Sequence, residues 1–445
     1  MSERPPLPPG PYLVLGLRVS GAAAARMLLA HGEVMGCDLG RPREAEGLAD
    51  AGVEVALESD GLHLVPRAGT VVKSPGVPAH APAVAAARAR GVEVVGELET
   101  AWRLIEAEFV AVTGTNGKTT TAELLGAIHR AAGVPVVVAG NVGTPLAELV
   151  GERGDVVVCE ASSFQLEDAT AFAPEAAVLL NLSEDHIDRH GTFAAYRDAK
   201  LRIFARQGRE NVAVLPLELE PPGGAAARIV RFGRDEGAEL ACVEGTLVYE
   251  GSVLMATEEI RLRGAHNLDN AMAAAATALA RGVPPAAVCE ALKTFPGVPH
   301  RLEEVAERDG VLFVNDSKAT NPDSARVGIE AFPGGVHAIF GGSLKGGSFG
   351  ALRAPVTARC RACYLVGEAE ERLAADLQGT VALHRCGTLE RAVEAAAAAA
   401  RRGEVVLLSP ACASFDAFRD FEHRGAVFRA LAQRLAGTPE ASPAG

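Results

Sequence analysis

A glycine-rich segment, Gly-Thr-Asn-Gly-Lys-Thr-Thr at residues 114–120, constrains the fold of this chain more than any other feature. The apolar run 109–113 precedes it, and a helical pattern follows it from Thr121 to Ala132. A strand, a glycine loop and a helix in this order surround an anion with backbone N–H groups and the positive helix end. Lys118 can then reach the β- and γ-phosphates, and the Thr119 hydroxyl can bind Mg²⁺. The segment predicts a domain that binds ATP or GTP.

The segment differs from the common phosphate-binding loop at one position. Such loops carry a glycine five residues before the Gly-Lys pair, and here that residue is Val112. The residues alone leave one alternative, a plain turn between strand and helix with a lysine on the surface.

The charge balance argues against nucleic acid as a partner. The 445 residues hold 43 Lys and Arg against 56 Asp and Glu, a formal net charge of −13, whereas a nucleic-acid-binding face is basic. No apolar run approaches the ~18 residues of a membrane span, and the start MSERPPLPPGP does not have the pattern of a signal peptide. We therefore expect a cytoplasmic monomer that binds small-molecule substrates and neither nucleic acid nor membrane.

The eight cysteines are scattered along the chain, which favours reduced core residues over a disulfide framework. Cys360 and Cys363 form the one close pair, and without a second pair or a nearby histidine a zinc site is not expected.

Strand and helix patterns alternate along the chain, which predicts parallel sheets with ligands at the carboxyl ends of the strands. The acidic stretch 97–108 is expected to be a helical linker between the first and second segments, and residues 226–262 are short and strand-rich. Residues 295–299, Phe-Pro-Gly-Val-Pro, break the pattern before a third segment. The expected strands are 12–17, 33–38, 70–73, 92–95, 109–113, 135–139, 155–160, 176–181, 212–216, 311–315, 336–340, 363–366 and 405–409, and the expected helices are 20–31, 121–132, 192–207, 267–281, 285–294 and 390–401.

Three residues downstream of the glycine loop are candidates for metal or phosphate chemistry. Glu160 ends a buried strand, where a carboxylate is well placed to bind Mg²⁺. His186 lies among acidic residues after another strand, and there it can be a metal or phosphate ligand or part of a solvated loop. Lys200 is, from its own sequence context, an ordinary helical lysine.

Several motifs together resemble the Mur ligase family over nearly the whole chain. They are GTNGKTT at 114–120, EASSFQL at 160–166, LNLSEDHIDRH at 180–190, YRDAKLRIF at 196–204, GAHNLDNAMAA at 264–274 and HRLE at 300–303. The resemblance implies an ATP-dependent amide ligase of peptidoglycan precursor synthesis. It also implies three α/β domains: an N-terminal Rossmann-like domain at 1–97, a central P-loop ATPase-type parallel sheet with a small antiparallel addition at 98–298, and a C-terminal Rossmann-like domain at 299–445.

Further motifs point to one substrate set within the family. GLRVSG at 16–21, SPGV at 74–77, NDSKATNPDS at 315–324 and LSPACASFDAFRDFEHRG at 408–425 resemble the members that add D-glutamate to UDP-N-acetylmuramoyl-L-alanine. The Asp-Asn-Pro-Arg motif of the relatives that add meso-diaminopimelate is absent, and the nearest segment, residues 320–323, lacks its arginine.

The resemblance implies roles for residues that bind ATP and metal. ATP is expected at Gly114, Thr115, Asn116, Gly117, Lys118, Thr119, Thr120, Asn267, Asn270, His300, Arg301 and Asp316. Two Mg²⁺ ions are expected, at Thr119, Glu160, His186 and Lys200. Lys200 matches the carbamylated lysine of the family, and carbamylation would turn its cation into a hard oxygen anion suited to Mg²⁺. Lys118, Glu160, His186 and Lys200 are the expected catalytic residues.

The resemblance also implies the residues that bind the two other substrates. The UDP-sugar is expected at Ser20, Asp38, Ser74 and Asn141, and D-glutamate at Lys318, Thr320, Lys345, Ser414 and Phe421. Two lysines suit a substrate with two carboxylates, although Lys345 also fits an ordinary turn. Arg18 replaces the second glycine of a dinucleotide-binding fingerprint, which argues against bound NAD. Arg18 either offers charge to a UDP phosphate or faces solvent.

Three other functions remain as alternatives. Another ligase of the family would add L-alanine, a different third residue, or glutamate to folate. A nucleotide-binding regulator would hydrolyse ATP without an amino-acid substrate. A silent nucleotide-sugar-binding protein would be free to lose the metal and phosphate residues that this chain keeps.

Overall fold

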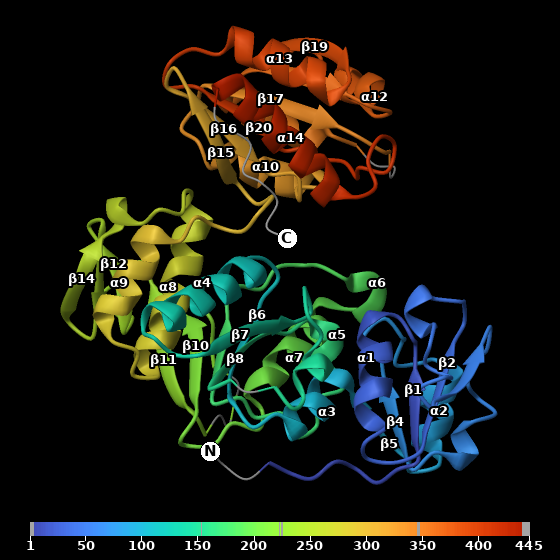
Figure 1. Ribbon diagram of the computed structural model, residues 1–445. Coiled ribbons are helices and arrows are strands. Elements are labelled where there is room, and N and C mark those ends of the chain that lie inside the picture. Colours follow the sequence, from blue (N-terminus) through green and yellow to red (C-terminus); the bar gives the residue numbers. More distant parts are fainter. Residues whose placement is uncertain (1–3, 153, 222, 224–225, 345–347, 438–445) are drawn as a thin grey trace. The chain divides into compact units, whose positions relative to one another are not determined.

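The computed structural model describes residues 4–152, 154–221, 223, 226–344 and 348–437 (Figure 1). The chain divides into two compact units. The first comprises Met1–Ile260 with Leu268–Thr294, and the second comprises Arg261–Asn267 with Phe295–Gly445. Mixed α/β structure with sheets that are mainly parallel confirms the predicted fold class. No helix among the described residues is long and apolar enough to cross a membrane.

The first unit begins with a five-stranded sheet in the order β3-β2-β1-β4-β5, in which every pair of neighbouring strands is parallel. Apolar side chains alternate between its two faces. Tyr12 and Val14 of β1 pack on the side of α1, and Leu13 and Leu15 pack on the side of α2. The elements are β1 Tyr12–Leu15, α1 Val19–Leu28, β2 Val34–Asp38, β3 Glu54–Leu57, β4 Thr70–Lys73, α2 Pro82–Ala89 and β5 Glu93–Gly96.

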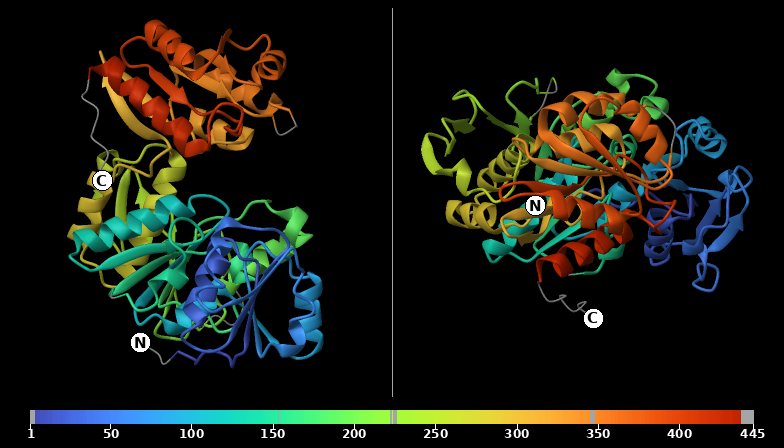
Figure 2. Two further views of the ribbon diagram at one scale, coloured as in Figure 1. Left: turned by 45° about the vertical axis from the view of Figure 1, so that its right-hand side comes forward. Right: turned by 90° about the horizontal axis from the view of Figure 1, so that it is seen from above.

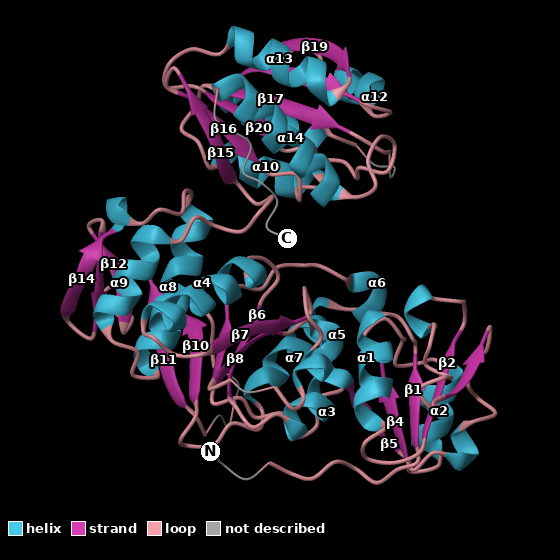
Figure 3. Ribbon diagram, viewed as in Figure 1, coloured by secondary structure: helices cyan, strands magenta, loops and turns pink. Residues whose placement is uncertain are grey.

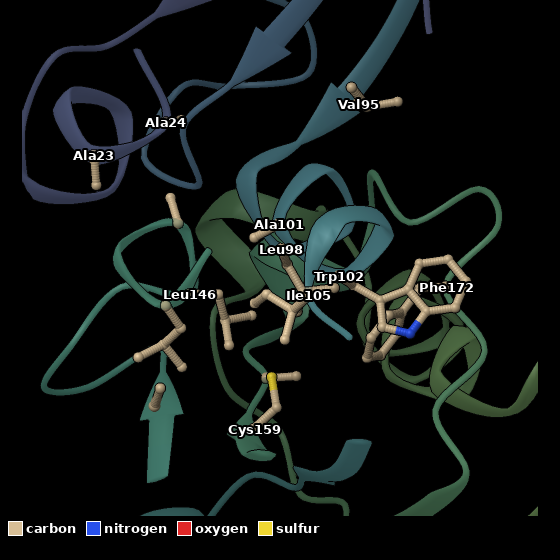
Figure 4. Packing of buried hydrophobic residues seen from close by; sticks show 14 of the residues in the cluster. Ala23, Ala24, Val95, Leu98, Ala101, Trp102, Ile105, Leu146, Cys159 and Phe172 are labelled. Carbon is tan, nitrogen blue, oxygen red and sulfur yellow. The ribbon is translucent and has the colours of Figure 1, made fainter. Parts of the chain in front are cut away.

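The acidic stretch 97–108 is helical in its first part, as predicted, and that helix is packed in the core. Helix α3 covers Glu97–Leu104, and Glu97, Leu98 and Trp102 are buried. Figure 4 shows Leu98, Ala101, Trp102 and Ile105 packed near Leu146, Cys159 and Phe172. The buried carboxylate of Glu99 accepts hydrogen bonds from the side chain of Arg103 and from backbone N–H groups of residues 170 and 171. The Glu99 carboxylate is therefore accommodated in this core because donors from α3 and from residues 170–171 satisfy it.

The second sheet of this unit has nine strands in the order β14-β13-β12-β11-β10-β9-β6-β8-β7 within the described ranges. Its strands are parallel except for the hairpins that join β12, β13 and β14, which form the expected antiparallel addition. The elements are β6 Glu108–Thr113, α4 Lys118–Ala131, β7 Val136–Gly140, β8 Val156–Glu160, α5 Ser163–Leu166, β9 Ala176–Leu179, α6 Ile187–His190, α7 Phe193–Leu201, β10 Val212–Pro216, β11 Arg228–Gly233, β12 Leu240–Val243, β13 Thr246–Tyr249, β14 Ser252–Ala256, α8 Ala265–Ala280 and α9 Pro285–Thr294.

Two of the expected helices have different bounds next to the candidate site. Helix α4 starts at Lys118 rather than at Thr121, so Lys118 and Thr119 lie in its first turn. The helix expected over 192–207 is α7, which ends at Leu201 and continues as a 3-10 turn over Arg202–Phe204.

The second unit is built on a six-stranded sheet in the order β15-β16-β20-β17-β18-β19, which is parallel except for the β15–β16 pair. Helices cover both faces of it (Figures 2 and 3). Helices α10, α11 and α12 pack on one face, and α13 and α14 pack on the other. The elements are β15 Glu303–Arg308, β16 Val311–Asn315, α10 Pro322–Glu330, β17 Val336–Gly341, α11 Arg353–Arg359, β18 Cys360–Val366, α12 Glu370–Asp376, β19 Ala382–Gly387, α13 Leu389–Ala399, β20 Val405–Leu408 and α14 Phe421–Ala436.

The cysteines are part of the packing. All eight lie among the described residues and are free, and Cys37, Cys159, Cys360, Cys363 and Cys412 are buried. Cys360 and Cys363 both belong to strand β18.

Candidate active site

The loop between β6 and α4 has a backbone that requires glycine. Gly114 has a φ of 158° and Gly117 a φ of 85°, both in the range that L side chains rarely adopt. A Cβ added at Gly117 would lie 2.1 Å from Oδ1 of Asn270. The sequence-predicted residues Gly117 and Asn270 are therefore direct neighbours in the first unit, and no side chain fits between them.

Substitution of Gly117 by alanine tests this close approach. We expect the positive φ alone to lower the free energy of unfolding by about 1–3 kcal/mol, and the collision with Asn270 to distort the loop and weaken ATP binding. Thermal unfolding and ATP titration measure the two effects. Gly133→Ala is the matched control, because Gly133 has a φ of 73° but open space around the added Cβ. Equal ATP affinity in both variants would contradict a special role for this contact.

Lys118 lies at the loop, as its predicted role requires. Its Nζ donates to the carbonyl oxygens of Gly114 and Thr115, each at 2.9 Å. The backbone N–H of Asn116 donates to Oδ1 of Asn181 at 2.9 Å, and the Thr115 hydroxyl is 3.0 Å from the hydroxyl of Tyr196. The segment after β9 and helix α7 therefore contact the loop through the side chains of Asn181 and Tyr196.

Glu160 stands at the end of β8, directly beside the loop strand β6, with Val112 as its register partner. Its side chain is joined to two other predicted residues. Thr119 Oγ1 donates to Oε2 at 2.8 Å, and Asn141 Nδ2 donates to Oε1 at 3.0 Å. A carboxylate and a hydroxyl are the hard oxygen donors that Mg²⁺ prefers. The described residues contain no group of three His, Cys, Asp or Glu that could bind a metal alone, so an ion here would need phosphate oxygens or water as well.

Lys200 is far from the ordinary helical lysine that its sequence context indicates. It is 2% exposed on α7, and its Nζ donates to the Gly114 carbonyl at 2.7 Å. Burial, followed by the nearby charge of Lys118, lowers the pKa of Lys200 to about 7. A substantial fraction of this amine is therefore uncharged near neutral pH.

The Tyr196 ring lies near both Lys200 and His186. The Tyr196 ring lies 4.7 Å from Nζ of Lys200 and 6.3 Å from the His186 ring. His186 has a φ of 52°, lies half exposed ahead of α6, and packs on Phe164 with ring centroids 4.9 Å apart. Tyr196 and Asn181 are contacts that the sequence analysis did not single out, although both lie inside the motifs that it used.

Three of the four residues predicted to bind the UDP-sugar, Ser20, Asp38 and Ser74, lie at or just after the carboxyl ends of β1, β2 and β4, whereas Asn141 follows β7 beside Glu160. Asp38 accepts hydrogen bonds from the backbone N–H groups of Leu17 and Gly40, each at 2.8 Å. Ser74 Oγ donates to the Gly16 carbonyl at 2.7 Å. Ser20 is in the first turn of α1, next to the exposed Arg18. Parallel strands place these ends at one edge of the sheet.

The second unit gathers most of the residues predicted for D-glutamate. Nζ of Lys318 lies 3.7 Å from the centroid of the Phe421 ring, and Ser414 is buried in the chain between β20 and α14. A cavity of about 150 Å³ is lined by Thr320, Asn321, Pro322, Ser343, Ser348, Phe349, Ala411, Cys412 and Ala413. Lys345 lies outside the described residues.

The residues of the second unit predicted to approach the nucleotide are Asn267, His300, Arg301 and Asp316. Asp316 is buried, which raises its pKa to about 7, and its carboxylate accepts from Ser409 Oγ at 2.7 Å and from the Leu302 N–H at 3.3 Å. His300 has a φ of 64°, and its Nδ1 is 2.9 Å from Nδ2 of Asn315.

Comparison with known proteins gives the family. A model of the Mur ligase middle domain matches residues 112–278, and a model of the Mur ligase glutamate ligase domain matches residues 300–412. A protein of Acidobacterium capsulatum named UDP-N-acetylmuramoylalanine--D-glutamate ligase is 43% identical, covering 94% of this chain and 95% of the relative. The chain belongs to the Mur ligase family. A protein of Geotalea daltonii with the same name is 42% identical over 96% of this chain and 97% of the relative.

Solved structures of Mur ligases show the same fold. The UDP-N-acetylmuramate-alanine ligase MurC of Thermotoga maritima has a TM-score of 0.58 at 20% identity, covering 96% of this chain and 100% of that chain. The MurF ligase of Thermotoga maritima, solved in complex with ADP, also has a TM-score of 0.58 at 20% identity, covering 91% of this chain and 96% of that chain.

A buried arginine of this Mur ligase was missed by the sequence analysis. Arg424 of α14 is 2% exposed, and its guanidinium donates to Ser317 Oγ and to the carbonyl oxygens of Ser317, Gly341, Cys412 and Ala413. Burial lowers its pKa to about 10. These bonds join the end of β17 to the segments next to Lys318 and Ser414. The FRDFEHRG motif contains this residue, but its role depends on contacts between distant segments.

Replacement of Arg424 by methionine should leave several of these buried carbonyl groups without a donor. Because hydrogen bonds from a charged donor contribute about 1.5–3 kcal/mol each and losses are partly relieved by relaxation, we expect a loss of about 2–4 kcal/mol in the free energy of unfolding. Urea denaturation measures it. Arg434→Met on the same helix is the control, since the Arg434 side chain is 66% exposed. Equal stability of the two variants would contradict the structural role of Arg424.

Proposed function

We propose that this chain joins D-glutamate to UDP-N-acetylmuramoyl-L-alanine, driven by ATP, in peptidoglycan precursor synthesis. The observation that carries the proposal is the relationship over nearly the full length, at 42–43% identity, to proteins named for this activity. The phosphate-type loop before α4, the contact of Lys318 with Phe421 and the cavity lined in part by Thr320 also support it.

The proposed reaction has two steps. The alanine carboxylate of the UDP-sugar attacks the γ-phosphorus of ATP, which forms an acyl phosphate and releases ADP. The amine of D-glutamate then attacks the acyl carbon, and the resulting tetrahedral intermediate expels phosphate and forms the amide. A carboxylate and a triphosphate repel each other, so the site must neutralise charge and hold the groups in line. Lys118 is proposed to supply that charge at the β- and γ-phosphates.

Mg²⁺ fits the oxygen donors beside the loop, and two ions are part of the proposal. Thr119 and Glu160 would hold one ion, and the 2.8 Å separation of their side-chain oxygens supports a shared ion. His186 and a carbamylated Lys200 would hold the other. The ions would supply positive charge to the phosphate and the attacking carboxylate. An amine with a pKa near 7 supports carbamylation, because only the uncharged amine reacts with CO₂.

The remaining residues are proposed to bind substrates. Ser20, Asp38, Ser74 and Asn141 would hold the UDP-sugar, and Asn267, Asn270, Arg301 and Asp316 the nucleotide. Lys318, Thr320, Lys345, Ser414 and Phe421 would hold D-glutamate. The division into domains at 1–97, 98–298 and 299–445 belongs to the proposal, with the 295–299 segment as the hinge for closure. The proposal places the reaction in the cytoplasm, where ATP is made, and needs a single chain, because it uses residues of one chain only.

Phosphate release with different amino acids tests the proposal. UDP-N-acetylmuramoyl-L-alanine, ATP and Mg²⁺ are combined with D-glutamate, L-glutamate, L-alanine or no amino acid. We expect release only with D-glutamate. Release without any amino acid would favour an ATP-hydrolysing regulator, and release with L-alanine alone would favour another ligase of the family.

A further inference from the structure

A buried lysine joins the two sheets of the first unit. Lys73 ends β4 with a side chain that is fully buried. Its Nζ lies 2.7 Å from Oδ2 of Asp168 and 3.2 Å from Oε1 of Glu167, two acids that follow α5 on the central sheet. A charge buried to this degree requires partners, and both carboxylates come from the segment that directly follows α5.

The same lysine holds the turn that carries Ser74. Nζ of Lys73 donates to the carbonyl oxygen of Val77 at 2.9 Å, and the Val77 N–H donates to the Ser74 carbonyl at 3.0 Å. Arg189 donates to the same Val77 oxygen at 2.9 Å and also to Oε1 of Glu167. Two cations, Lys73 of β4 and Arg189 of α6, therefore share one carbonyl oxygen and one carboxylate oxygen. We call Lys73, Val77, Glu167 and Arg189 the Val77 clamp.

The clamp continues to His186. Arg189 belongs to the four-residue helix α6, which His186 immediately precedes. The guanidinium carbon of Arg189 lies 5.1 Å from the centroid of the Phe164 ring, and the rings of His186 and His190 lie 4.9 Å and 5.5 Å from the same ring. A displacement of Arg189 would therefore shift both α6 and the ring on which His186 rests.

We infer that the Val77 clamp is a positioning device that couples the Ser74 turn, where the UDP-sugar is held, to the placement of His186. The inference rests on the proposed function for the identity of the UDP-sugar. Arg189 touches neither substrate nor metal in this scheme, and it acts through Val77 on one side and through Phe164 on the other. Its fork geometry is what allows one side chain to bond a carbonyl and a carboxylate while lying against a ring.

Arg189→Met tests the clamp without removing the fully buried charge of Lys73. Four proteins are compared: the unchanged chain, Arg189→Met, Arg189→Lys and Arg197→Met. Arg197 is the matched control, because it lies on the neighbouring helix α7 with a half-exposed side chain paired to Asp198. The measurements are the calorimetric Kd for UDP-N-acetylmuramoyl-L-alanine without ATP, the KM for ATP, the half-saturating Mg²⁺ concentration and the Tm.

We expect Arg189→Met to weaken UDP-sugar binding by about tenfold and to raise the half-saturating Mg²⁺ concentration several-fold, with the KM for ATP within about twofold. Arg189→Lys should recover part of both losses, since it keeps the charge but not the fork. Arg197→Met should behave like the unchanged chain. A role in stability alone would lower Tm and leave Kd and the Mg²⁺ requirement in place, which would overturn the inference.

The outcomes also separate the clamp from the proposed function. A weaker Kd with an unchanged Mg²⁺ requirement would overturn the coupling to His186. If the unchanged chain binds the UDP-sugar but does not use D-glutamate, the proposed function fails while the Kd comparison still decides on the clamp. If the unchanged chain does not bind the UDP-sugar, both are overturned.

Discussion

Replacing Lys118 by alanine will abolish ATP-dependent phosphate release. Its Nζ lies 2.9 Å from two carbonyl oxygens of the loop, so the ammonium is already held where a phosphate bound to the loop would need it. No other basic residue was predicted for the phosphates, and loss of a charged group that stabilises phosphoryl transfer lowers kcat by about 10³-fold or more. Phosphate release in the presence of all three substrates measures the effect.

The control for Lys118→Ala is Lys293→Ala. Lys293 lies on α9 with a side chain that is 44% exposed and paired to Glu259, so its loss removes an equal charge away from the loop. The control should keep its activity, and both variants should have a Tm close to that of the unchanged chain. Near-normal turnover by Lys118→Ala would contradict the assignment of the loop as a phosphate-binding site.

Replacing Lys200 by methionine should separate activity from stability. The amine is buried beside Lys118, and both burial and this neighbour disfavour its charged form. Methionine fills a similar volume without that unfavourable charge, so the free energy of unfolding should stay the same or rise. Activity should fall by about 10²–10⁴-fold, because the carbamate would be lost as a ligand of Mg²⁺.

Carbamylation of Lys200 can be detected directly, and the lowered pKa of its amine gives the direction in which carbamylation changes with pH. The pKa of Lys200 is lowered to about 7, so the uncharged amine that reacts with CO₂ is scarce at pH 6 and dominant at pH 8. With ¹³C-labelled bicarbonate, a carbamate resonance should grow over this range and be absent from Lys200→Met. Lys293→Met is the matched control and should keep the resonance. A resonance that persists in Lys200→Met would assign the carbamate to another lysine.

Most central strands were predictable, and three missed strands have a common physical character. Strands such as Val212–Pro216 are buried continuously, so their apolar runs stand out in the sequence. The edge strands β3, β15 and β19 carry exposed or half-exposed residues, and none of the three was predicted. An edge strand needs a partner on one side only, so its sequence lacks an apolar run. Helix α14 was missed because its sequence was interpreted as a substrate motif.

The residues of the candidate site also divide into those with a local sequence pattern and those without one. The glycine loop, Lys118, Thr119 and Glu160 could be found because the loop and the strand before Glu160 leave a local pattern. Lys200 was found only through the family resemblance, because its burial comes from segments far away in the chain. Tyr196, Asn181 and Arg424 were not singled out, since each is important for the segments that it joins and not for its sequence neighbours.

The sequence by itself therefore determined the order of strands and helices, the phosphate-type loop and the family, because these depend on residues close together in the chain. Tertiary structure alone decided which charges are buried and what they contact. Lys73 and Lys200 are the same residue type in the sequence. In the structure Lys73 is paired with two acids, whereas Lys200 lies near the cation Lys118 and donates to a carbonyl oxygen. The energy of a buried charge depends on groups that the fold brings to it from distant segments, and that information is not local.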